Sequence, residues 1–288
     1  MLKFKLDLEY TPRSPKHGLP FTESSHLRSA SSYEFNTKEI GIALVDLWNF
    51  GWDDGPLVTS LGWELSTERG VSHALRKKEI ITNRIAPAIS ELRQLGVQIF
   101  HCNHAPFLNS FPQWLNSTTE EERRKLESPG NQYVDVKESN NVFPEKEWQQ
   151  EWSLKHSNDV YHLDWSNLQI ETYSQIQIPQ VVQPQERDLL VYSKEQFHRI
   201  LTEHNIRVLF YMGFETDECI THSDYGIINM RSYGYMTNIV RDCTTTYESA
   251  ETVEGLWRTK VAIEQIEKRW GYSINAYDLL RGIKSSDR

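Results

Sequence analysis

Hydrophobic residues in this chain gather in short runs separated by helical or polar segments. Residues Ile40–Val45 read IGIALV, and a second apolar run covers Val97–Phe100. Unbroken runs of this length are typical of strands buried on both faces of a parallel sheet. Between them, isoleucine and leucine recur at helical spacing over residues 79–95, and Gly96 ends the predicted helix. Strand, helix and strand together predict a βαβ unit.

The same alternation returns at Asp188 and continues almost to the end of the chain. Ser193 and Gln196 have the spacing of a capping box at the start of a helix. Strands are predicted over 189–192, 206–212, 235–240 and 273–277, and helices over 194–204, 219–233 and 254–269. We therefore predict a single α/β domain with a mostly parallel sheet of about five or six strands.

Two parts of the chain fall outside this alternation. Residues 1–38 hold one alternating stretch and a loose polar segment, and we expect an N-terminal arm that pairs as an edge strand. Residues 107–186 are polar and too long for a simple connection, which indicates an insertion into a domain of residues 39–288. We expect this segment to cover the active site as a lid, with a surface excursion for subunit contact as the alternative. Its tryptophans are Trp114, Trp148, Trp152 and Trp165.

Composition narrows the class of protein. The chain has 31 Lys and Arg against 40 Asp and Glu, a net charge of −9, and a surface of that sign repels nucleic acid. No apolar run approaches the roughly 18–20 residues that span a bilayer, and the first residues do not resemble a secretory signal. The three cysteines, Cys102, Cys219 and Cys243, fit neither a disulfide framework nor a zinc pattern. We expect a cytoplasmic protein that contacts neither nucleic acid nor membrane.

Candidate chemistry lies at the ends of the predicted strands, because ligands of open parallel sheets bind beyond the carboxyl ends of the strands. Asp46 follows the first predicted strand, and Cys219 lies in the turn after the strand over 206–212. A carboxylate and a thiol therefore converge on one edge of the sheet. Each residue alone also has an ordinary structural explanation, since most such aspartates are caps and most free cysteines are packed in the core.

Cys219 has neighbours that act on its thiol in opposite directions. Thr216 is a natural N-cap, which would place Cys219 in a first helical turn, where free amides and the helix dipole stabilise a thiolate. Asp217 and Glu218 oppose this effect, because nearby negative charge raises a thiol pKa. The same amides could receive the oxyanion that forms when a thiolate attacks a carbonyl.

Four segments together resemble the isochorismatase-like cysteine hydrolases, a superfamily that includes nicotinamidases, N-carbamoylsarcosine amidases and isochorismatase. The resemblance covers residues 38–106 and 186–278. The segments are VDLWNF, HCNHAP, GFETDECI and YGYMTNIVRDCTTT, of which the G-x-x-T-x-x-C pattern is the most specific. The resemblance implies a Rossmann-like three-layer α/β/α fold, an Asp–Lys–Cys triad and a homo-oligomer.

Carried over residue by residue, the resemblance makes Asp46 the triad aspartate and Cys219 the nucleophile. It places a cis peptide at Phe214–Glu215 and forms the oxyanion hole from the amides of Glu215 and Cys219. The triad lysine is the uncertain member. Lys194 is the nearest candidate, although the capping box makes it a residue of a first helical turn. The other candidate cations are Arg187, Lys137 and Lys155.

Several further residues are expected to line the pocket. Trp48 replaces a glutamine common in the family and, with Trp52, suggests an aromatic wall for a flat or apolar substrate, with core packing as the alternative. His104 and His222 are the remaining pocket candidates. Nicotinamidases bind a divalent metal with Asp and two His near this place, but the D-x-H arrangement is absent here, so we predict no metal and no other cofactor. We interpret Arg241–Asp242 as a local ion pair and Cys243 as core packing.

These residues support a cofactor-independent hydrolase that cleaves a C–N bond of a small amide or carbamoyl compound through a Cys219 thioester, with Asp46 as acid and base. One alternative is a non-catalytic binding or assembly protein of the same fold. The other is an ether hydrolase of the isochorismatase type, in which Asp46 acts as an acid and no thioester forms.

Overall fold

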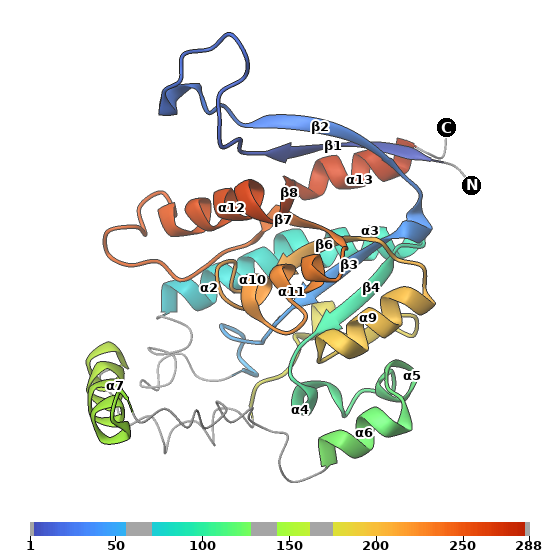
Figure 1. The fold of residues 1–288 in the computed structure, drawn as a ribbon. Helices are drawn as coiled ribbons and strands as arrows, with labels where there is room; N and C mark the ends of the chain where they lie inside the picture. Colours follow the sequence, from blue (N-terminus) through green and yellow to red (C-terminus); the bar gives the residue numbers. More distant parts are fainter. Residues whose placement is uncertain (1–2, 56–70, 128–142, 162–174, 286–288) are drawn as a thin grey trace.

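The computed structural model describes residues 3–55, 71–127, 143–161 and 175–285. Its strands form one sheet of eight in the order β2-β1-β8-β7-β6-β3-β4-β5 (Figure 1). The strands are β1 Phe4–Tyr10, β2 Ser29–Phe35, β3 Ile40–Val45, β4 Gln98–Cys102, β5 Leu189–Val191, β6 Val208–Gly213, β7 Met236–Thr244 and β8 Gly271–Ile274.

The six strands from β8 to β5 run parallel, which confirms the predicted α/β class and the predicted parallel sheet. The additional two strands come from the N-terminal arm. β1 pairs antiparallel with β8, and β2 pairs antiparallel with β1, so the arm extends the sheet at one edge, as expected. Phe4, Leu6 and Leu8 of β1 are buried, because alternate residues of a strand lie on the same face and this face of the arm packs on the core.

Helices cover both faces of this sheet and complete three α/β/α layers (Figure 1). Within β3, Ile42 and Leu44 face a core that includes α3 and α13, whereas Ala43 and Val45 face a core that includes α9, α11 and α12. The helices are α2 Val71–Ile80, α3 Ala86–Gln94, α4 Ala105–Leu108, α5 Trp114–Ser117, α6 Glu120–Glu127, α7 Lys146–Tyr161, α9 Lys194–Glu203, α10 Cys219–His222, α11 Ile227–Ser232, α12 Trp257–Arg269 and α13 Ala276–Lys284. No described helix is long and apolar enough to span a membrane.

The predicted helix over 79–95 is longer than expected and contains one wider turn. It begins at Val71 with α2, passes through a π-helical turn over Ile81–Ile85, and continues as α3. The apolar residues at 81, 85, 89 and 92 are buried, as their spacing predicts. The unexpected N-terminal half carries a buried lysine, Lys77.

The predicted helix over 219–233 is two short helices, α10 and α11, joined at Gly226. A Cβ atom at Gly226 would lie 2.9 Å from the carbonyl oxygen of Ser223 and 3.0 Å from that of Cys219. The chain can therefore fold back here only where the residue lacks a side chain.

The expected ion pair between Arg241 and Asp242 is wrong. Both residues lie inside β7, where neighbouring side chains point to opposite faces of the sheet. Arg241 pairs with Glu9 of β1 at 2.8 Å, while Asp242 accepts a hydrogen bond at 2.8 Å from the backbone amide of Ala276, at the start of α13. Cys243 is buried in the core, as predicted.

A buried cluster connects the residue before β5 to the neighbouring strand β4 and to α3. Asp188 receives hydrogen bonds from Arg93 Nε at 3.2 Å and Arg93 Nη2 at 2.5 Å, and its Oδ2 lies 3.2 Å from Nε2 of His101. Burial tends to raise the pKa of Asp188, but His101 and Arg93 outweigh it and hold that pKa below its ordinary value. Burial lowers the pKa of His101, which therefore favours the neutral ring.

We predict that Asp188→Asn lowers the free energy of unfolding at pH 7 by about 3 kcal/mol, because it leaves a largely buried guanidinium without its carboxylate. Since the folded-state pKa of Asp188 is depressed, its stabilising effect is present above the unfolded-state value and is lost as pH falls through the folded-state value. Urea unfolding at pH 7, pH 4 and pH 2.5 should show the difference between variant and wild type nearly unchanged at pH 4 and smaller at pH 2.5, because the effect is lost only below the ordinary value of 3.8. Asp159→Asn, which breaks an exposed pair with Lys155, is the control and should leave stability nearly unchanged.

Candidate active site

The candidate site forms where β3 and β6 end side by side. Val45 pairs with Gly213 in parallel register, and the amide of Phe214 donates to the carbonyl of Val45 at 3.0 Å. Gly213 has φ 119°, and a Cβ atom there would lie only 2.0 Å from the carbonyl oxygen of Val45. This close approach brings the segment that follows β6 against Asp46, the first residue after β3.

Asp46 is a buried carboxylate with φ 47° and 3% exposure. Its Oδ1 accepts a hydrogen bond from Oη of Tyr225 at 3.0 Å, and its Oδ2 has no geometrically satisfactory hydrogen bond within the described part of the chain. Burial raises the pKa of Asp46 above its ordinary value, and interactions with His104, Cys219, Tyr225 and Lys77 limit that increase. A carboxyl group whose pKa is raised holds a proton more readily than an exposed one, so it can both accept a proton and return it.

The thiol of Cys219 interacts with this carboxylate from the first residue of α10. Burial is the main cause that raises the pKa of the thiol well above its ordinary value, and the charges of Asp46, Glu215 and Glu218 raise it further. The expectation of a thiolate stabilised by the helix is therefore wrong. α10 has only four residues, too few for a substantial dipole, and Cys219 rests as a thiol.

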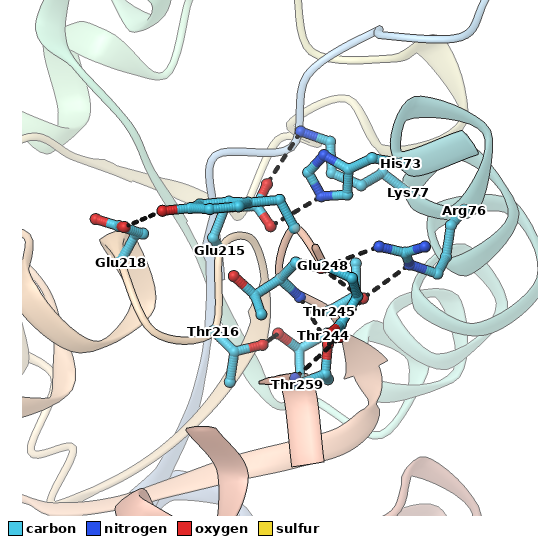
Figure 2. Close-up of polar contacts among 12 residues, drawn as sticks. His73, Arg76, Lys77, Glu215, Thr216, Glu218, Thr244, Thr245, Glu248 and Thr259 are labelled. Carbon is cyan, nitrogen blue, oxygen red and sulfur yellow. Dashed lines mark hydrogen bonds and ion pairs between the residues drawn. The ribbon is translucent and has the colours of Figure 1, made fainter. Parts of the chain in front are cut away.

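The expectation that Thr216 caps this helix is also wrong, because Glu218 occupies the N-cap position. The hydroxyl of Thr216 instead hydrogen-bonds that of Thr244 at 2.7 Å, in the interior between the ends of β6 and β7 (Figure 2). Thr216 thus holds the turn down onto the sheet.

The turn between β6 and Cys219 holds the residues that the resemblance assigns to an oxyanion hole. The peptide between Phe214 and Glu215 is cis, as expected. Within the described residues, the amides of Glu215 and Cys219 donate no hydrogen bond to the chain, whereas the amide of Thr216 donates to the carbonyl of Thr245 at 3.1 Å. Both unpaired amides thus remain available to a negatively charged oxygen.

The segment after β7 anchors the outer side of this turn. Tyr247 donates to Glu218 at 2.8 Å, and Thr246 donates to Asp217. Arg258 of α12 reaches the same Asp217 at 2.8 Å, so the two acidic residues next to Cys219 are both engaged. Arg258 and these hydroxyls therefore compensate part of the negative charge of Asp217 and Glu218.

Helix α2 contributes two functional candidates that the sequence reasoning missed. Lys77 is buried and donates to Oε1 of Glu215 at 3.3 Å, while His73 Nε2 lies 3.0 Å from Oε2 of the same residue (Figure 2). The signal was present in the spacing. Extending the buried stripe at residues 81, 85 and 89 backward in steps of four reaches 77 and 73, which places a lysine and a histidine on the buried face.

The three expected cations that the structure describes do not pair with Asp46 or Cys219. Nζ of Lys194 lies 3.9 Å from Asp224, and its side chain is 37% exposed. Arg187 is exposed, and Lys155 pairs with Asp159 on α7. The fourth candidate, Lys137, lies outside the described residues.

The four residues expected in the pocket fall in different places. Trp48 lies near the site, with its ring centroid 5.9 Å from Nζ of Lys77, and His104 is exposed yet close enough to Asp46 to lower its pKa. Trp52 instead lies under Lys78 at 5.4 Å. His222 is exposed, with its ring 6.5 Å from that of Trp270. Within the described residues, no group of three His, Cys, Asp or Glu side chains is arranged to hold a metal.

Both ends of the inserted segment 107–186 meet the chain just after Asp46. Phe107 contacts Trp48, and Gln177 exchanges two hydrogen bonds of 2.9 and 3.0 Å with Asn49. Beside them lies a cleft whose lining includes His104. The lid itself stays a prediction, since much of the segment lies outside the described residues. Of its tryptophans, Trp114 is buried, Trp148 and Trp152 are exposed on α7, and Trp165 is not described.

No protein-family model and no curated protein matches this chain. Several solved structures resemble it at low identity. A cysteine hydrolase from Pseudomonas syringae pv. phaseolicola 1448A is 12% identical, with 88% of this chain and 95% of that chain covered and a TM-score of 0.49. The nicotinamidase of Staphylococcus aureus is 11% identical (82% and 97% covered, TM-score 0.39), and N-carbamoylsarcosine amidase from Thermoplasma acidophilum is 12% identical (83% and 96% covered, TM-score 0.41).

We predict that Gly213→Ala lowers the free energy of unfolding by about 3 kcal/mol or more, because the new methyl group would collide with the backbone of Val45. Gly234→Ala is the matched control. Gly234 also has a positive φ, 93°, but no atom lies within 4 Å of the added methyl, so only backbone strain of about 1–2 kcal/mol is expected. Urea unfolding of both variants measures the difference, and equal losses would contradict the close approach of β3 and β6.

Proposed function

We propose that this protein is a cysteine hydrolase that cleaves a C–N bond in a small amide or carbamoyl compound. The observation that carries the proposal is the hydrogen-bonding interaction between a buried carboxylate of raised pKa, Asp46, and the thiol of Cys219, the first residue of the helix that follows the neighbouring strand β6. The two amides of Glu215 and Cys219, which donate to no described acceptor, support the same reaction class.

The reaction begins with transfer of the thiol proton of Cys219 to Asp46 as sulfur attacks the carbonyl carbon. The developing oxyanion accepts hydrogen bonds from the amides of Glu215 and Cys219. Protonated Asp46 then donates to the leaving amine, the C–N bond breaks, and a thioester forms. Water attacks the thioester with Asp46 as base, which releases the acid and restores the thiol.

The raised thiol pKa fits this scheme, because the proton leaves Cys219 only when an electrophile is present and Asp46 is ionised. We further propose that the protein acts in the cytoplasm as a homo-oligomer, and the scheme requires no cofactor.

The first test is release of ammonia from nicotinamide, N-carbamoylsarcosine, benzamide and acetamide. We predict that wild type releases ammonia from at least one of them and that Cys219→Ala reduces the rate by about 1,000-fold or more, since it removes the nucleophile. Cys243→Ala, at a buried cysteine of the core, is the matched control and should retain turnover. Equal rates for wild type and Cys219→Ala would contradict the nucleophile assignment.

The raised pKa values of both Asp46 and Cys219 also favour a second candidate, ether hydrolysis of the isochorismatase type. There Asp46 supplies a proton as an acid, and the thiol forms no covalent bond. Turnover of isochorismate by both wild type and Cys219→Ala, with loss in Asp46→Asn, would identify this reaction. Absence of turnover on every compound would favour the non-catalytic binding protein.

The pH dependence of kcat/KM tests the role of Asp46 as base. Because Asp46 must be ionised and burial raises its pKa, the rate should fall as pH drops through a value above the ordinary 3.8. Tyr225→Phe removes a hydrogen bond that stabilises the carboxylate, so this acidic limb should move about 1 pH unit higher. The control is Tyr211→Phe, which removes a buried hydroxyl bonded to the carbonyl of Tyr225 and should leave the limb in place.

A further inference from the structure

Lys77 is a buried lysine at the edge of the candidate site. It lies on α2 with 1% of its surface exposed. A buried ammonium is costly unless other groups compensate its charge. Here Nζ donates to Oε1 of Glu215 at 3.3 Å and lies 5.3–5.9 Å from the ring centroids of Phe50, Phe214 and Trp48. Among the described residues, a carboxylate and three aromatic rings thus lie around this charge.

Glu215 receives both of its side-chain partners from one helix. Lys77 contacts Oε1, and His73, one turn earlier on α2, contacts Oε2 (Figure 2). Burial alone would raise the pKa of Glu215, but Lys77 and His73 reverse this effect and keep the carboxylate ionised. The backbone amide of the same residue is one of the two proposed oxyanion donors. Fixing the side chain of Glu215 thereby fixes the direction of that amide.

The same ammonium acts on Asp46, because its positive charge favours the ionised carboxylate against burial. Lys77 thus lies within electrostatic reach of both acidic residues of the site, Asp46 after β3 and Glu215 after β6. Lys194 offers no such link, since Nζ of Lys194 pairs with Asp224 at the exposed start of α9.

We propose that Lys77 is the cation of this site and that Lys77 and His73 are positioning residues. Together they hold the turn of Glu215 and Cys219 opposite Asp46 and favour negative charge on the pair formed by Asp46 and Cys219. The inference concerns the site of the proposed hydrolase. Its test needs no substrate, so it can succeed or fail independently of turnover.

The test is the rate at which iodoacetamide alkylates Cys219 as a function of pH, read by mass spectrometry of the peptide that contains Cys219. The midpoint of this profile reports ionisation of the coupled pair. The other groups that act on the pair are His104, Tyr225, Cys102 and Glu218, and they are common to all variants.

Lys77→Met should move the midpoint upward by about 1 pH unit or more, because it removes positive charge near the pair. Such a shift makes alkylation of Cys219 about tenfold slower at pH values below the midpoint. Glu215→Gln removes negative charge near Cys219 and should move the midpoint downward. Opposite shifts would support an electrostatic role, since merely loosening the turn would affect both variants alike. The matched control, Lys194→Met, should leave the midpoint unchanged.

A second variant covers the case in which Lys77→Met fails to fold. The double variant Lys77→Met/Glu215→Gln removes both charges of this ion pair together, so it should fold, with a midpoint between those of the two single variants. Shifts of Lys77→Met and Glu215→Gln in the same direction would overturn the proposal. The proposal would also be overturned if the midpoint of Lys77→Met did not lie above that of wild type, or if the midpoint of the double variant did not lie above that of Glu215→Gln. An upward shift in Lys194→Met would overturn it as well.

Discussion

The parallel pairing of β3 with β6 is the constraint on which the rest of the site depends. At Gly213 the two backbones approach so closely that no side chain fits between them, and the next peptide hydrogen-bonds the carbonyl of Val45. Asp46 and the turn to Cys219 therefore leave the sheet side by side. That juxtaposition places carboxylates next to a thiol in a region largely shielded from water.

Such a site must balance buried negative charge. Asp46 is buried and Glu215 is 12% exposed, and each raises the pKa of Cys219. The compensating groups come from elements remote in sequence, namely Lys77 and His73 of α2 and the hydroxyl of Tyr225. The result is a resting thiol beside an ionisable base, in which a proton moves when an electrophile arrives. This differs from a helix-stabilised thiolate, for which the four residues of α10 are too short.

The segments around the site are anchored from opposite sides. The residues after β7 hold Thr216, Asp217 and Glu218, while α2 holds the side chain of Glu215. Between these anchors, two backbone amides donate to no described acceptor. Pre-organised donors of this kind stabilise a developing charge without rearrangement, which is why the rigidity of the turn matters for the proposed reaction.

The sequence by itself determined the six parallel strands, the edge pairing of the N-terminal arm and the convergence of Asp46 with Cys219. These depend on local apolar runs and on the rule that parallel strands end at one edge. The cis peptide at Phe214–Glu215 followed from the family resemblance. Only the tertiary structure decided the pKa of Cys219 and the placement of Lys77. Burial and charge at a site depend on elements that are far apart in the chain. The position of Cys219 in a first helical turn therefore did not predict the pKa of its thiol. The buried positive charge near Asp46 comes from Lys77, more than 100 residues upstream of Cys219, and not from Lys194.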